Sequence, residues 1–135
     1  MRTVYFAHDQ QENPELRKHQ LELAGYTVRL LKNYRELVAA LKEGQPDLLL
    51  LDVLLEGKNG FEASLEITEH TKERNFPIVL CATFYRQRPF REEAQRCGAQ
   101  DYLNLPMKPD QFVRRVNQAI GYFVPPAAQK SGTAA

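Results

Sequence analysis

The sequence lacks several features that would assign it to a specialised class. It has only two cysteines, Cys81 and Cys97, whose spacing fits no metal site, so we expect reduced thiols and a cytoplasmic location. Lys and Arg total 18 and Asp and Glu total 17, which gives a net charge of +1. A charge this small does not attract the chain to nucleic acid or to an anionic membrane. Apolar runs such as residues 48–51 are far shorter than the roughly 20 residues of a membrane span. The apolar N-terminal stretch turns polar at His8 and Asp9, which is too early for a signal peptide.

Sequence signals of common enzymes are also absent. No glycine-rich phosphate-binding loop follows the first apolar run, and no Ser or Cys nucleophile ends a predicted strand. We therefore expect a protein that is not an enzyme. Hydrophobic residues make up 43% of the 135 residues, which is enough to bury one core. We expect one domain over residues 1–124, followed by a disordered tail or linker over residues 125–135.

Short apolar runs alternate with helical patterns along this domain, which predicts an α/β fold with a doubly wound parallel sheet. The predicted strands are residues 4–7, 27–31, 48–51, 77–82 and 101–103. The first helix begins at Asn13 and Pro14, has Leu16 and Leu23 on one face, and ends at Gly25. The other four helices are marked by apolar or small residues at helical spacing: Tyr34, Leu37, Val38 and Leu41; Phe61, Leu65 and Thr68; Phe90, Ala94 and Cys97; and Phe112, Val116, Ile120 and Phe123.

The carboxyl ends of the predicted strands are where a doubly wound sheet binds its ligands. The residues at these ends are His8 and Asp9, then Asp52, then Ala82 and Thr83, and finally residues 104–106. Asp9 and Asp52 are expected to converge on one pocket. Two carboxylates with water and a backbone carbonyl suit Mg²⁺, which prefers hard oxygen ligands. The alternative is that these acids only cap helices or end strands.

Four segments in a fixed order carry a resemblance to a known family. They are residues 4–9 (VYFAHD), 46–52 (PDLLLLD), 57–60 (GKNG) and 98–103 (GAQDYL), the last followed by Pro106. Over residues 2–124 the chain resembles the receiver domain of bacterial response regulators, the CheY-like superfamily. The resemblance implies a flavodoxin-like (βα)5 fold with five parallel strands, helices on both faces, and a cis-proline turn at Pro106.

The resemblance also implies phosphoryl transfer in a two-component phosphorelay. Asp52 matches the phosphoacceptor, which receives its phosphoryl group from a histidine kinase or a phosphotransfer protein. Asp9 matches the second acid of the Mg²⁺ pair, and the backbone carbonyl of Leu54 would complete the metal ligands that the protein supplies. A divalent cation offsets the repulsion between a phosphoryl group and two carboxylates.

Three residues depart from the family pattern. His8 replaces the first acid, Ala82 replaces the switch hydroxyl, and Leu105 replaces the lysine that pairs with the phosphoryl oxygens. Imidazole is a poor ligand for Mg²⁺, so we expect weak metal binding. Thr83 could supply the hydroxyl if its strand slipped by one residue, and Lys108 could reach the site from beyond the proline.

Two readings remain open from the sequence. One is a receiver phosphorylated on Asp52, and the other is a pseudo-receiver that serves as an interaction module without phosphorylation. In both, a downstream protein or a second copy would bind the face of the fourth helix, fifth strand and fifth helix. Tyr102 matches the switch aromatic of the family, but without the hydroxyl we expect it to pack. The basic, aromatic residues 83–91 belong to this partner face in preference to a nucleic-acid site, and Arg114 and Arg115 are expected to be solvated.

Overall fold

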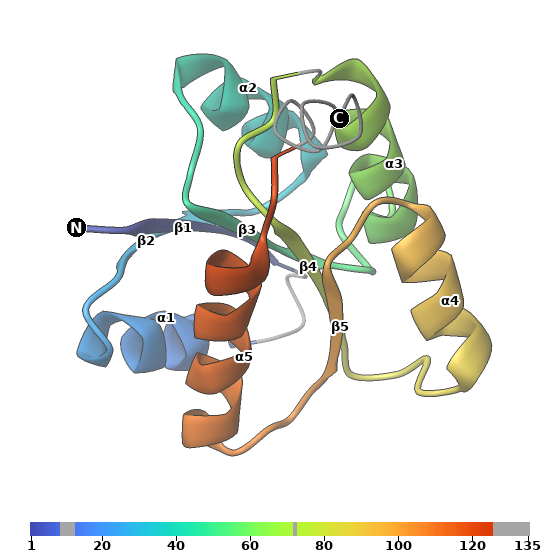
Figure 1. Ribbon diagram of the computed structural model, residues 1–135. Coiled ribbons are helices and arrows are strands. Elements are labelled where there is room, and N and C mark those ends of the chain that lie inside the picture. The colour runs from blue at the N-terminus through green and yellow to red at the C-terminus, as the bar shows by residue number, and fades with distance from the viewer. Residues whose placement is uncertain (9–12, 72, 126–135) are drawn as a thin grey trace, which may run out of the picture.

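The computed structural model describes residues 1–8, 13–71 and 73–125. Its elements alternate strictly, in the order β1 (Thr3–Ala7), α1 (Pro14–Leu23), β2 (Thr27–Leu31), α2 (Tyr34–Glu43), β3 (Leu48–Asp52), α3 (Gly60–His70), β4 (Ile78–Ala82), α4 (Arg88–Arg96), β5 (Asp101–Asn104) and α5 (Pro109–Tyr122). All strand pairs are parallel, and the sheet order is β2-β1-β3-β4-β5 (Figure 1). The predicted flavodoxin-like fold is therefore confirmed.

The strand order reverses between β1 and β3, and this reversal positions the site. From β1 the chain moves outward to β2 and then returns to place β3 on the other side of β1. Crossovers diverge at such a point and leave a crevice at the carboxyl ends of the two strands. Asp52 is the last residue of β3 and His8 follows β1, so both lie at this crevice.

The helices cover the sheet as two layers, each with its own core (Figure 1). On one face, Leu21 of α1 and Phe112 and Val116 of α5 pack against alternate residues of the central strands. On the other face, α2, α3 and α4 contribute Leu37, Ile67 and Ala94. Strands β3 and β4 are buried at every residue, as their continuous apolar runs predict.

Helix α1 corrects the sequence analysis. Leu16 and Leu23 do share a face, but that face points to solvent, and the two residues are 52% and 76% exposed. The face toward the sheet instead carries Leu21 and Arg17, which are four residues apart and both buried. The Arg17 guanidinium lies 5.1 Å from the centre of the Phe112 ring, which is a cation–π contact with a core residue of α5.

Helix α3 begins immediately after the loop that follows Asp52. The side chain of Asn59 accepts a hydrogen bond from the backbone N–H of Glu62 (2.9 Å), which caps the first turn. Leu65, one of the residues whose spacing predicts this helix, is 38% exposed, and the buried face of α3 carries Ala63 and Ile67. None of the helices in the described part of the chain has the length and apolar character to cross a membrane. The expected tail, residues 125–135, lies outside the described residues except for Pro125.

Candidate functional site

Asp52 occupies the centre of the carboxyl edge. It ends β3 opposite Cys81 of β4, and it is only 3% exposed. Its Oδ1 accepts a 2.9 Å hydrogen bond from the backbone N–H of Leu54, which holds the carboxylate in the turn that leaves the strand. A buried carboxylate at the end of a central strand has a fixed direction, as a phosphoacceptor requires.

The oxygen donors near Asp52 fit only part of a magnesium site. The Asp52 carboxylate and the Leu54 backbone carbonyl belong to one turn and are the kind of ligand that Mg²⁺ takes. Asp9 lies outside the described residues, so its place beside Asp52 stays a prediction. His8 is 6% exposed, donates its backbone N–H to the Leu31 carbonyl (3.0 Å), and packs edge-on against Phe6 with ring centres 5.7 Å apart. Within the described residues, no three His, Cys, Asp or Glu side chains form a metal-binding group.

Gly60 holds the start of α3 against the end of β3. Its backbone N–H donates to the Val53 carbonyl (2.9 Å), and a Cβ on this residue would lie 2.6 Å from the Asp52 carbonyl oxygen. Only glycine permits this close backbone approach. The nearby Lys58 pairs with Glu66 of α3 and lies 4.8 Å from the Tyr34 ring centre, so it is engaged on the α2–α3 side of the loop.

Two of the three positions that depart from the family, Ala82 and Leu105, are packed in the core. Ala82 is 1% exposed, and β4 pairs it with Asn104 of β5, so Thr83 falls just beyond the strand. Leu105 is 2% exposed and packs in the same core cluster as Phe112. The bond between Leu105 and Pro106 is cis, as the resemblance implied. Leu105 thus contributes to the core between the sheet and α5, and Lys108 stands exposed at the start of α5.

An arginine from the β4–α4 loop lies at the same edge. Nη2 of Arg86 donates a 2.7 Å hydrogen bond to the carbonyl of Leu105, which joins the β4–α4 loop to the end of β5. Sequence reasoning grouped Arg86 with a partner surface and missed this contact. Its distance of 19 residues from Leu105 gave no signal, because only the pairing of β4 with β5 brings the two loops together.

Tyr102 of β5 points inward and is 3% exposed. Its ring stacks on Phe61 of α3 with centres 6.1 Å apart, and its hydroxyl donates to the carbonyl of Tyr85 (2.7 Å). Burial raises the pKa of the Tyr102 phenol to about 12, and the charge of Asp52 adds to this rise. The side chain of Tyr102 is therefore packed and hydrogen-bonded between β5, α3 and the β4–α4 loop.

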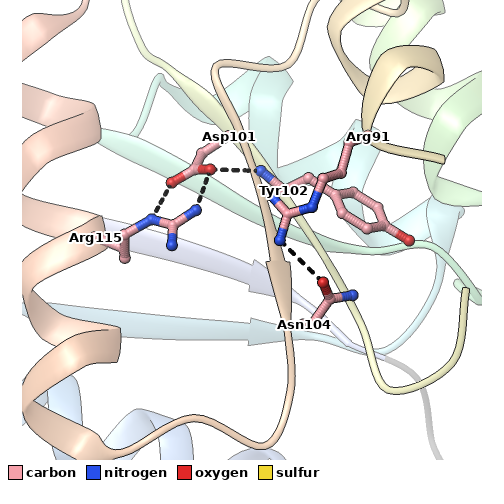
Figure 2. A network of polar contacts seen from close by, with 5 residues as sticks. All are labelled: Arg91, Asp101, Tyr102, Asn104 and Arg115. Atoms are coloured by element: carbon pink, nitrogen blue, oxygen red, sulfur yellow. Dashed lines mark hydrogen bonds and ion pairs between the residues drawn. The ribbon is translucent and has the colours of Figure 1, made fainter. Parts of the chain in front are cut away.

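Figure 2 shows the polar contacts around β5, with Arg115 and Arg91 on opposite sides of the strand. Arg91 of α4 donates to Oδ1 of Asn104 (3.0 Å), and its guanidinium lies 5.8 Å from the Tyr102 ring centre. Arg115 of α5 makes two hydrogen bonds to Asp101, of 2.7 and 2.6 Å. Arg115 is thus held by Asp101, which corrects the expectation that it is solvated, whereas Arg114 is exposed.

The fold and this edge define a class: a flavodoxin-like α/β domain whose third strand ends in a buried aspartate. The particular family follows from comparison with known proteins. Residues 4–117 match the family model described as response regulator receiver domain, so the chain belongs to this family and is a receiver domain of two-component signalling. Receiver domains act as signalling modules, and their acidic site typically binds Mg²⁺.

Individual relatives support the same assignment. Protein PilH of Pseudomonas aeruginosa is 28% identical over 100 residues, which are 74% of this chain and 82% of PilH. An uncharacterised 14.6 kDa protein of Leptolyngbya boryana is 30% identical over 88% of this chain and 90% of its own length. The crystal structure of a putative response regulator from Chloroflexus aurantiacus superposes with a TM-score of 0.80 at 26% identity, covering 89% of this chain and 98% of that one.

Proposed function

We propose that this receiver domain is phosphorylated on Asp52 by a histidine kinase or a phosphotransfer protein. The observation that carries the proposal is the fixed carboxylate of Asp52, buried at the topological switch point and aligned by the Leu54 N–H. A carboxylate oxygen attacks the phosphorus of a phosphohistidine, a P–O bond forms, and the P–N bond breaks. The electron pair of that bond stays on the imidazole nitrogen of the donor.

Mg²⁺, when bound, neutralises charge on the transferring phosphoryl group. The residues that would hold it are Asp52, the Leu54 carbonyl and Asp9. The chain itself aligns Asp52, and the side chains around it shield the carboxylate from bulk water, since Asp52 is only 3% exposed. The loss of the family's lysine and hydroxyl removes two contacts to the phosphoryl oxygens. Each such charge-assisted contact is worth roughly 1.5–3 kcal/mol, so the acyl phosphate should be weakly stabilised.

Phosphorylation by a small-molecule donor tests this proposal. Incubation of the full chain with acetyl phosphate and Mg²⁺ should add one phosphoryl group, measured by intact-protein mass spectrometry. Asp52→Asn should abolish the addition. Asp47→Asn is the matched control, since Asp47 is an exposed acid just before the same strand and accepts a hydrogen bond from the Thr3 N–H at the opposite edge. Phosphate retained in Asp52→Asn, or absent from the wild type, would rule out Asp52 as the acceptor.

A second candidate function is a phosphorylation-independent pseudo-receiver that acts as an interaction module. It is favoured by Ala82 and Leu105, which leave neither switch hydroxyl nor lysine, and by Tyr102, already bonded inward to Tyr85. A ligand shifts a two-state equilibrium only by its differential affinity for the two states. With both contacts gone, the α4–β5–α5 face should stay fixed and should bind a downstream protein, or a second copy, in either state.

Chemical-shift mapping with beryllofluoride and Mg²⁺, a mimic of aspartyl phosphate, separates the two candidates. Shifts confined to the neighbourhood of Asp52 and Ala82 would support a site that is occupied without signalling. Large shifts at Tyr102 and along α5 would restore the phosphorylation switch.

We further propose that residues 1–124 form the receiver, with residues 125–135 as tail or linker, and that the protein is cytoplasmic. The location is supported by Cys81 and Cys97, which are both buried free thiols.

A further inference from the structure

A cavity that does not include Asp52 lies between α3, α4 and β5. It has a volume of about 560 Å³ and is bordered by α3, α4, β5 and the loops that lead into β4 and β5. Its lining includes Arg74, Arg91, Gly98, Gln100, Asp101 and Tyr102. This volume is within the range of small-molecule sites. The cavity runs along β5, from Gly98 and Gln100 before the strand to Arg91, which contacts Asn104 at the end of the strand.

Arg74 is the unusual residue of this cavity. It is only 5% exposed, and burial lowers the pKa of its guanidinium. A guanidinium has five N–H donors. Two long contacts of Arg74 run to Oε1 of Gln100 (3.4 Å) and to the carbonyl of Gly98 (3.5 Å), and its Nε is buried without a partner. Its charge also lies 5.4 Å from the centre of the Phe123 ring.

No carboxylate neutralises Arg74 in the part of the chain that the structure describes. A buried charge without a counter-ion is costly, and proteins normally pair it. Asp101 also lines this cavity, but its carboxylate already accepts two hydrogen bonds from Arg115. The negative charge of Asp101 is therefore paired with Arg115 and not with Arg74. The lining therefore keeps an unneutralised positive charge at Arg74, and Arg91 at the rim adds a second.

We propose that this cavity binds a small oxyanion-bearing molecule, a phosphate or carboxylate compound, with Arg74 as the principal ligand and Arg91 as a second contact. An oxyanion matches the planar fork of a guanidinium and supplies the acceptors that Arg74 lacks. Arg91 sits over the Tyr102 ring and donates to Asn104 through one nitrogen, so its remaining N–H groups include donors for such a ligand. The site is independent of phosphorylation at Asp52.

Titration of the ¹⁵N-labelled full chain tests the site. Inorganic phosphate and succinate are added separately at constant ionic strength, with chloride as the screening control. We expect saturable shifts of the backbone amides of Gly98 and Gln100 for at least one of the two anions. Binding by phosphate alone or succinate alone identifies the class of ligand within the proposal, and binding by neither overturns it.

Variants assign the binding to Arg74. Arg74→Gln should weaken binding at least about tenfold, because a charge-assisted hydrogen bond is lost. Arg96→Gln is the matched control, since it removes the same charge from an exposed α4 residue that pairs with Glu93 outside the cavity, and it should bind as the wild type does.

Equal weakening in Arg74→Gln and Arg96→Gln would indicate net charge alone and overturn the proposal. Shifts confined to residues 52–60 and 82–86 would place the anion at the phosphorylation edge and also overturn it. If Arg74→Gln does not fold, Arg91→Gln decides at an exposed position: a severalfold rise of Kd supports the site, and an unchanged Kd contradicts it.

Discussion

The hydroxyl of Tyr102 donates a 2.7 Å hydrogen bond to the backbone carbonyl of Tyr85, and this bond ties β5 to the loop between β4 and α4. Tyr85 has a φ of 61°, a left-handed conformation that is uncommon for a residue other than glycine. Its ring packs 5.0 Å from that of Phe90, so a side-chain contact and the hydrogen bond hold the loop together. The loop borders the phosphorylation edge on one side and the α4 surface on the other.

The first prediction concerns this bond. Tyr102→Phe removes the hydroxyl and leaves the ring stacked on Phe61, so the free energy of unfolding should fall by about 1 kcal/mol, as for one hydrogen bond. Urea unfolding monitored by circular dichroism measures the change. Hydrogen exchange should also become faster in residues 83–87, and unchanged exchange there would mean that the bond does not hold the loop.

A pH dependence follows from the same residue. The pKa of Tyr102 is raised from 10.0 to about 12 in the folded protein, so its stabilising effect is complete below pH 10 and is lost as the pH rises through 12. The wild type should therefore lose on the order of 2 kcal/mol more stability than Tyr102→Phe between about pH 9.5 and pH 12. Cys97, whose pKa is raised to about 11 by burial, titrates in both proteins and cancels in the difference. If the free energy of unfolding fell equally with pH in the wild type and in Tyr102→Phe, the prediction would be wrong.

Gly60 and Gly121 form a matched pair for substitution by alanine. A Cβ at Gly60 would lie 2.6 Å from the Asp52 carbonyl oxygen and 2.7 Å from the Val53 Cα, so backbone must move and Gly60→Ala should cost about 2 kcal/mol or more. Nothing lies within 4 Å of a Cβ at Gly121 in α5, so Gly121→Ala should stabilise the helix by about 0.5–1 kcal/mol. Thermal unfolding measures both. Because Gly60 abuts Asp52, its variant should also be phosphorylated more slowly.

The ion pair between Asp101 and Arg115 should contribute measurably to the docking of α5 on β5. Both side chains are partly buried, at 22% and 33% exposure, and the contact is bidentate. A double-mutant cycle with alanine at both positions should give a coupling energy of about 1 kcal/mol. The pair of Arg88 and Glu92 in α4 is exposed on both sides and should give a coupling near zero. Equal coupling energies for the two ion pairs would show that partial burial does not strengthen the Asp101–Arg115 pair.

Metal affinity should respond to His8. His8→Asp adds a carboxylate after β1, next to Asp9 in the sequence, and this further hard anion should increase Mg²⁺ affinity about tenfold or more. Isothermal titration of the wild type, His8→Asp and Asp52→Ala measures this, with Asp52→Ala expected to lose the weak binding of the wild type. Equal heats for the wild type and Asp52→Ala would remove Asp52 from the metal site.

The sequence alone determined the fold and the edge at which the site lies. Continuous apolar runs at β3 and β4 predict strands buried on both faces, and glycine or proline between the runs predicts where each element begins or ends. These are local signals, because a strand or a helix start depends mainly on adjacent residues. The position of Asp52 at the end of its run then follows from chain order and from the rule that ligands bind at the carboxyl ends of parallel strands.

The contacts of the charged side chains depend on the folded chain and could not be predicted from the sequence. Arg17 is buried where Leu16 and Leu23 are exposed, Arg115 is paired with Asp101, and Arg74 is buried in a cavity wall. The partners that set these roles are distant in the sequence, since Arg115 pairs with Asp101, Arg74 contacts Gln100, and Arg17 lies over the ring of Phe112. No local pattern records such contacts. An arginine has a long apolar stem and a charged end, and its surroundings in the folded chain determine whether it covers core, forms an ion pair or is left without a counter-ion.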